Sequence, residues 1–214
     1  MESISHTWNN PDAGIHPLPA DPKEIAASLR AARSCMNLFP YLGIRFGDRG
    51  DAFARTDSGY LATLVQNSQE YVFEQTQWLA RVLANRGMPR WLMEVHLEIL
   101  AEELNTAVPE GKLSYGKLLN ASVKLRSDRQ SIIPQDAFER TSTQFSEQSG
   151  NLIENFGGLV VSAVCDASYG LTVAVPSLVD WASDKDCFSN NWRTALADLL
   201  EHSRLAANPS PSCP

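Results

Sequence analysis

The sequence between residues 68 and 105 reads SQEYVFEQTQWLARVLANRGMPRWLMEVHLEILAEELN, and it predicts two consecutive helices. Gly87 favours the left-handed conformation that ends a helix, and Pro89 is tolerated at the start of the next one. Apolar residues recur at helical spacing on both sides of this break. The predicted inner faces are Val72, Thr76, Leu79, Ala80 and Leu83 in the first helix, and Leu92, Val95, Ile99 and Leu100 in the second.

Capping residues, glycines and prolines predict further helices outside this stretch. Asp21 can accept hydrogen bonds from the first amides of a helix that ends before Pro40. We expect residues 43–51, which contain three glycines and alternating charges, to form a loop. Other helices are predicted to begin at Asp57 and Ser114, and the last one spans residues 192–204.

The segment after Pro134 admits two interpretations. Phenylalanine or leucine recurs every seven residues, at Phe138, Phe145, Leu152 and Leu159, which favours a long helix or two helices broken near Gly150 or Gly157-Gly158. The valine-rich stretch 159–175 is also compatible with a short β-hairpin. We prefer the helix, because the seven-residue repeat leads directly into it.

These patterns predict an all-α protein, a helical bundle of about seven or eight helices. We expect one helical domain over residues 21–205, with a flexible arm at 1–20 and a flexible tail at 206–214, where Pro, Asn and Ser are frequent. A length of 214 residues with 43% hydrophobic and 20% charged residues is typical of a globular protein that buries a sizeable core.

Charge and composition narrow the classes of partner. A net charge of −7 and scattered basic residues argue against nucleic acid as a partner. The longest apolar runs are too short to span a bilayer, and the first 20 residues lack the pattern of a secretory signal. The four cysteines show neither zinc-ligand nor disulfide-framework spacing. We therefore expect a cytoplasmic protein that binds neither membranes nor nucleic acid.

Residues 57–126 carry a resemblance to a known family. Residues 60–64, 78–87 and 91–104 follow its first three helices, and VPEGKLSYGKLL at 108–119 follows its motif Trp-x-x-Gly-x-Ile-Ser-x-Ala-x-Glu-His at the Gly, hydrophobic and Ser positions. This stretch resembles the helical cap domain of cobalamin-binding modules, as in methionine-synthase-like proteins and MerR-type light sensors. The resemblance implies a four-helix sub-bundle and cobalamin, or another tetrapyrrole, as the cofactor.

The chain departs from the family at the positions that contact the cofactor. Val108 stands in place of the motif's Trp, and Leu118 and Leu119 stand in place of its Glu-His. Leucine offers no atom that coordinates cobalt, and the companion α/β domain has no counterpart in this sequence. Any cofactor contact must therefore come from other residues.

His96, Trp91 and Trp78 are the candidate ligand-binding residues. His96 lies beside the apolar stripe of its predicted helix, where it could bind a metal or haem, or simply pack against a neighbour. The two tryptophans could line a pocket for a flat ligand or anchor the core. We interpret Glu94, Glu98 and Glu102 as a solvated face, because no Glu-x-x-His pair accompanies them.

No catalytic or dinucleotide-binding fingerprint is present. The sequence therefore favours a non-enzymatic regulatory or sensory protein that binds a partner protein, a second copy of itself or a small ligand. The alternative is a metal- or tetrapyrrole-binding enzyme or carrier that uses His96.

Overall fold

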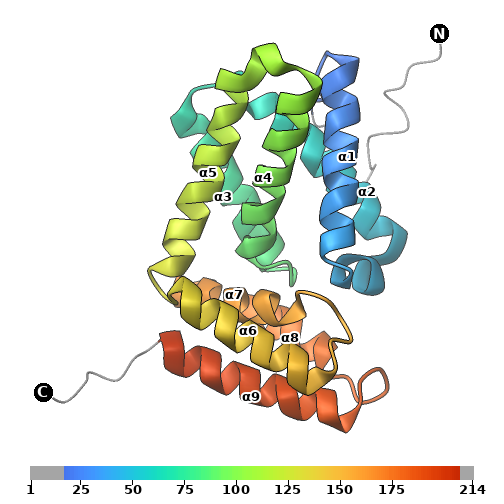
Figure 1. Cartoon of the computed structure of the whole chain (residues 1–214), viewed down its shortest axis with the longest axis vertical. Coiled ribbons are helices and arrows are strands. Elements are labelled where there is room, and N and C mark those ends of the chain that lie inside the picture. Colours follow the sequence, from blue (N-terminus) through green and yellow to red (C-terminus); the bar gives the residue numbers. More distant parts are fainter. Residues whose placement is uncertain (1–16, 208–214) are drawn as a thin grey trace, which may run out of the picture. The chain divides into compact units, whose positions relative to one another are not determined.

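The computed structural model describes residues 17–207, and all regular structure in that range is helical (Figure 1). The prediction of an all-α protein is confirmed, with nine α-helices and one short 3-10 helix in the described range. The helices are α1 (Pro22–Leu38), α2 (Tyr41–Leu64), α3 (Gln69–Ala84), α4 (Arg90–Ala107), η3 (Pro109–Gly111), α5 (Lys112–Gln130), α6 (Gln135–Ser149), α7 (Phe156–Ser168), α8 (Ala174–Ala182) and α9 (Asn190–Ala207).

The terminal predictions fall mostly outside the described residues. The arm predicted for residues 1–20 is described only from residue 17, and residues 17–19 there have no regular structure. The tail predicted for 206–214 is described only to residue 207, and those first two residues belong to α9.

The chain divides into two compact units. Unit 1 comprises Met1–Thr76 and Glu94–Val123, and unit 2 comprises Gln77–Met93 and Lys124–Pro214. The boundaries fall inside α3, α4 and α5, so each of these helices contributes one part to each unit.

In unit 1, α1 packs against α2. The helix α1 begins as predicted, because the Asp21 side chain accepts a hydrogen bond of 2.8 Å from the Lys23 amide and Pro22 occupies the first turn. Its fully buried positions are small residues, among them Ala27, Ala31 and Cys35. Small side chains let the two helices approach closely.

The loop expected over residues 43–51 is wrong, because these residues belong to α2. Side chains one turn apart support the helix there: Arg55 pairs with Asp51 at 3.0 Å, and the Arg45 guanidinium lies 5.7 Å from the centre of the Tyr41 ring. Only Gly47 leaves the helical conformation, with φ 54° and ψ −144°. Gly47 therefore places a sharp kink between two helical segments where a loop of nine residues was expected.

Two glycine substitutions test this kink. Gly47→Ala should lower the free energy of unfolding by about 1–3 kcal/mol, because only glycine adopts this φ/ψ combination without strain. Gly43 has helical backbone and no atom within 4 Å of an added Cβ, so Gly43→Ala should leave stability unchanged or raise it by up to about 1 kcal/mol. Urea unfolding of both variants provides the comparison, and equal effects would contradict the kink.

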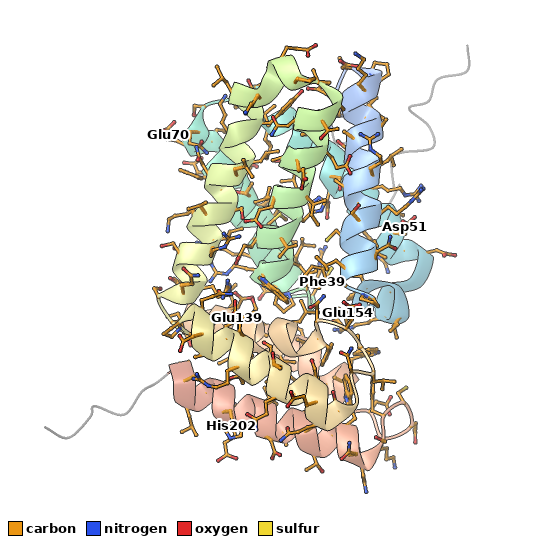
Figure 2. All side chains as sticks on the ribbon, viewed as in Figure 1. Phe39, Asp51, Glu70, Glu139, Glu154 and His202 are labelled. Atoms are coloured by element: carbon orange, nitrogen blue, oxygen red, sulfur yellow. The ribbon has the colours of Figure 1, made fainter. Side chains whose placement is uncertain are left out.

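In unit 2, α7 packs against α6, α8 and α9, and α6 lies alongside α9 (Figure 1). Every residue of α7 from Phe156 to Asp166 is buried, as expected for a helix that is apolar on nearly all sides. Figure 2 shows Glu139 of α6 and His202 of α9 on the outside of this unit, in keeping with their exposure. The unit is thus built around one central apolar helix.

An aromatic cluster fills the core of unit 2. The Phe188 and Trp192 rings stack with centroids 5.0 Å apart, and the Phe145 ring meets Trp192 edge-on at 5.0 Å. The Trp192 indole N–H donates to the Ala182 carbonyl at 2.9 Å, so its polar group is satisfied inside the core.

The segment after Pro134 consists of two helices, as one of the two interpretations predicts. The helix α6 ends at Gly150, which has the left-handed φ of 70°. Leu152 is 61% exposed, so the seven-residue repeat does not continue through the connection. The alternative β-hairpin over residues 159–175 is wrong: the stretch forms α7, a turn and the start of α8. A helix buried on all sides needs the same valine-rich composition as a buried strand.

Candidate functional site

The first turn of α4 is capped by a distant helix. Its first amides follow Pro89, which offers no side-chain acceptor. Instead, Asp166 accepts a hydrogen bond of 2.9 Å from the Arg90 amide, and the Ser162 hydroxyl accepts one of 3.1 Å from the Trp91 amide. Ser162 and Asp166 lie one turn apart on α7, so both face the start of α4. We call these two contacts the tertiary cap.

The tertiary cap includes a buried ion pair. Arg90 Nε lies 2.7 Å from an Asp166 carboxylate oxygen, and the two side chains are 7% and 2% exposed. Burial raises the pKa of Asp166, and the charge and hydrogen bonds of Arg90 oppose that shift. The Arg90 guanidinium also lies 4.5 Å from the centre of the Tyr169 ring, and Asp128 approaches it at 3.9 Å. Arg90 is thus held from several sides.

Replacing Asp166 tests how strongly the free energy of unfolding depends on this ion pair. Asp166→Ala should lower the free energy of unfolding by about 3–5 kcal/mol, because it leaves a buried guanidinium without its carboxylate. The matched control is Asp136→Ala, which breaks the exposed Asp136–Arg140 pair and should cost less than about 1 kcal/mol. Chemical unfolding measures both, and a small effect at Asp166 would show that the buried Arg90 does not depend on this carboxylate.

The tertiary cap fixes the position of Trp91. The ring of Trp91 meets Phe138 edge-on with centroids 5.1 Å apart. On another side it covers Gly158, where an added Cβ would lie only 2.4 Å from the indole ring. The main chain of Trp91 is thus fixed by a hydrogen bond, and its indole packs against an aromatic neighbour and a position that requires glycine.

An open hollow of about 420 Å³ lies over Trp91, within unit 2. Trp91 and Gly158 form its apolar part, and the rest of the lining is polar. Asn151 and Asn155 line it from the connection between α6 and α7, and both adopt left-handed φ values, 50° and 60°. The α6 side is lined by Ser142, Thr143, Ser146 and Glu147.

The three residues predicted to bind a ligand lie in different surroundings. Trp91 lines the hollow, whereas Trp78 and His96 are not among its lining residues. Trp78 is 52% exposed on α3, and His96 is 8% exposed within unit 1. The assignment of these residues to one cofactor site stays a prediction, and only Trp91 faces a described hollow.

His96 forms a buried pair with Ser58. The Ser58 hydroxyl donates to the Ala54 carbonyl at 2.7 Å and lies 2.9 Å from His96 Nε2. A hydroxyl has a single proton, so while Ser58 donates to the Ala54 carbonyl, a protonated His96 Nε2 is the donor toward Ser58. In that arrangement the main chain, and not the histidine, accepts the serine proton.

The burial of His96 predicts a dependence of stability on pH. Burial lowers the pKa of His96 from 6.5 to about 4. The unfolded chain takes up this proton near pH 6.5 and the folded chain only near pH 4, so stability falls as pH drops through this window, by on the order of 2–3 kcal/mol.

Unfolding by urea at pH 7 and pH 4.5 tests this pH dependence. His96→Gln retains a donor toward Ser58 but does not titrate, so its stability should fall less between the two pH values than that of the wild type. All carboxylates are common to both proteins. Equal losses would show that His96 does not titrate as described.

The interpretation of the α4 glutamates as a solvated face is wrong for Glu94, which is buried. Glu98 is half-buried and accepts a hydrogen bond of 2.7 Å from the Ser122 hydroxyl, whereas Glu102 is exposed. The buried stripe of α4 includes Met93, Leu97 and Leu104, so it is rotated from the predicted one and takes in Glu94. Within residues 17–207, no group of three or more His, Cys, Asp or Glu side chains is arranged to hold a metal ion.

Comparisons of the chain with protein-family models, with curated proteins and with solved structures find no match. Across the part of the chain that the structure describes, no helix is both long and apolar enough to cross a bilayer. The class that the fold defines is therefore an all-α helical protein.

Proposed function

We propose that this chain is a non-enzymatic regulatory or sensory protein, and that it binds a small ligand in the hollow over Trp91. The observation that carries the proposal is the fixed position of Trp91, whose main chain bonds to the Ser162 hydroxyl and whose indole packs on Gly158, where both Trp91 and Gly158 line a polar hollow. Binding sites gain affinity from groups that are already in place before the ligand arrives.

The composition of the lining favours binding over catalysis. The polar groups that line the hollow are hydroxyls, carboxamides and the single carboxylate of Glu147. General acid–base catalysis uses a titrating group matched to its task, most often a histidine, and the described lining has neither histidine nor cysteine. Groups of this kind orient a ligand by hydrogen bonds.

The connection between α6 and α7 also supports a ligand site. Asn151 and Asn155 are the two described residues other than glycine with positive φ, and both line the hollow. Asparagine tolerates this left-handed backbone, which lets the short connection carry both carboxamides.

A thermal-shift experiment with a panel of neutral sugars, amines, phosphorylated metabolites and carboxylates tests this function. A molecule that binds only the folded chain raises its melting temperature. The variant Asn151→Gly/Asn155→Gly removes both carboxamides while keeping a residue that tolerates the left-handed backbone. We expect at least one compound to stabilise the wild type and to lose this effect in the variant.

The control is Glu154→Ala, which alters an exposed side chain of the same connection outside the hollow (Figure 2). Glu154→Ala should respond to the ligand like the wild type. If no class of compound stabilises the wild type, or if the double variant responds equally, the hollow is not the binding site. Binding of cobalamin or another tetrapyrrole at His96 stays a separate prediction, and an absorbance spectrum after incubation with the cofactor checks it.

A further inference from the structure

The side chains over Trp91 also indicate which class of ligand the hollow would accept, an inference that rests on the proposed binding function. The lining offers three hydroxyls, from Ser142, Thr143 and Ser146, and two carboxamides, from Asn151 and Asn155. Hydroxyls and carboxamides both donate and accept hydrogen bonds. A ligand whose groups also do both is the best complement to such a surface.

The Ser142 and Ser146 hydroxyls are oriented by hydrogen bonds to carbonyls of α6, the helix that carries them. Ser142 donates to the Phe138 carbonyl at 2.7 Å, and Ser146 donates to the Ser142 carbonyl at 3.2 Å. Their single protons are thereby used within the helix, so toward the hollow these two oxygens act as acceptors. A ligand must therefore supply donors on this side.

The opposite side of the hollow can supply donors. A carboxamide carries two N–H donors and one acceptor oxygen, and Asn151 and Asn155 contribute one carboxamide each. The main-chain N–H of Asn151 donates to the Ser146 carbonyl at 2.7 Å, which joins this end of the connection to the end of α6. The hollow therefore has acceptors on one side and mixed groups on the other.

The indole of Trp91 provides an apolar surface beside these polar groups. Aromatic rings pack well against the flat C–H faces of small rings, and a tryptophan next to amides and hydroxyls serves both parts of such a ligand. The volume of about 420 Å³ lies in the range of small-molecule sites.

The charges at the hollow disfavour anions. Its described lining has no lysine, arginine or histidine, and it includes the carboxylate of Glu147. The whole chain carries a net charge of −7, which adds a repulsive field for phosphates and carboxylates. A cation could pair with Glu147 and the indole and could donate to the Ser142 and Ser146 oxygens, but it would offer no acceptor to the N–H groups of the Asn151 carboxamide.

We infer that the hollow over Trp91 binds a neutral polyhydroxylated ring, such as a monosaccharide or a cyclic polyol. One face of the ring packs on the indole, its hydroxyls donate to the Ser142 and Ser146 oxygens, and the carboxamides of Asn151 and Asn155 complete the contacts. The residues that select and orient the ring all belong to a single unit.

Isothermal titration of the full chain tests this inference with glucose, galactose and myo-inositol as neutral probes, choline and spermidine as cations, and glucose 6-phosphate as an anion. We expect saturable binding of at least one neutral probe, and a weaker response to glucose 6-phosphate than to glucose. Asn151→Gly/Asn155→Gly should weaken the neutral probe by about tenfold or more, which corresponds to about 1.4 kcal/mol. Glu154→Ala should have no effect.

The variant Glu147→Gln separates the two remaining ligand classes. It replaces the carboxylate with a carboxamide of the same shape, so a neutral probe should bind within about threefold of the wild type. Choline or spermidine that binds the wild type and is lost in Glu147→Gln would overturn the polyol proposal and leave the ligand-binding function intact. If no probe of any class binds, both proposals fail.

Discussion

Asp166 contacts the same residue twice, accepting one hydrogen bond from the main-chain amide of Arg90 and another from its guanidinium. Ser162 adds a third contact one turn away, to the Trp91 amide. A helix start that has no cap of its own is thereby joined to the central helix of unit 2. The remaining features of the site, including the position of Trp91 and the hollow above it, depend on this tertiary cap.

The tertiary cap contributes more to the register between α7 and the start of α4 than to net stability. A buried ion pair gains little over a well-packed apolar pair, because desolvation of both charges offsets their attraction. The rest of α7 is almost wholly apolar, and apolar packing alone tolerates rotation or sliding of a helix. Two polar side chains with fixed partners allow one register, which places Gly158 beneath the indole of Trp91. We interpret the polar pair as the element that specifies this arrangement.

Local signals in the sequence predicted several helices and some of their ends, because caps and left-handed stops depend on neighbouring residues; the helix start expected at Asp57 is wrong, since Asp57 lies inside α2. The N-cap at Asp21 and the stops at Gly87 and Gly150 are confirmed. The loop over 43–51 was wrong because contacts one turn apart outweigh the glycines. The tertiary cap could not be predicted, since its partners lie 71 and 76 residues apart. The one signal of the tertiary cap was Asp166, an aspartate at the end of an apolar run. Of the residues that line the hollow, only Trp91 was predicted from the sequence to bind a ligand.

Amide hydrogen exchange of Arg90 and Trp91, followed by NMR, tests the tertiary cap most directly. The first amides of a helix have no partner within it and normally exchange quickly. Here both amides donate to buried side chains of α7, so they should exchange as slowly as the amides in the middle of α4. Exchange at the rate of an uncapped first turn would contradict the tertiary cap, and with it the fixed position of Trp91.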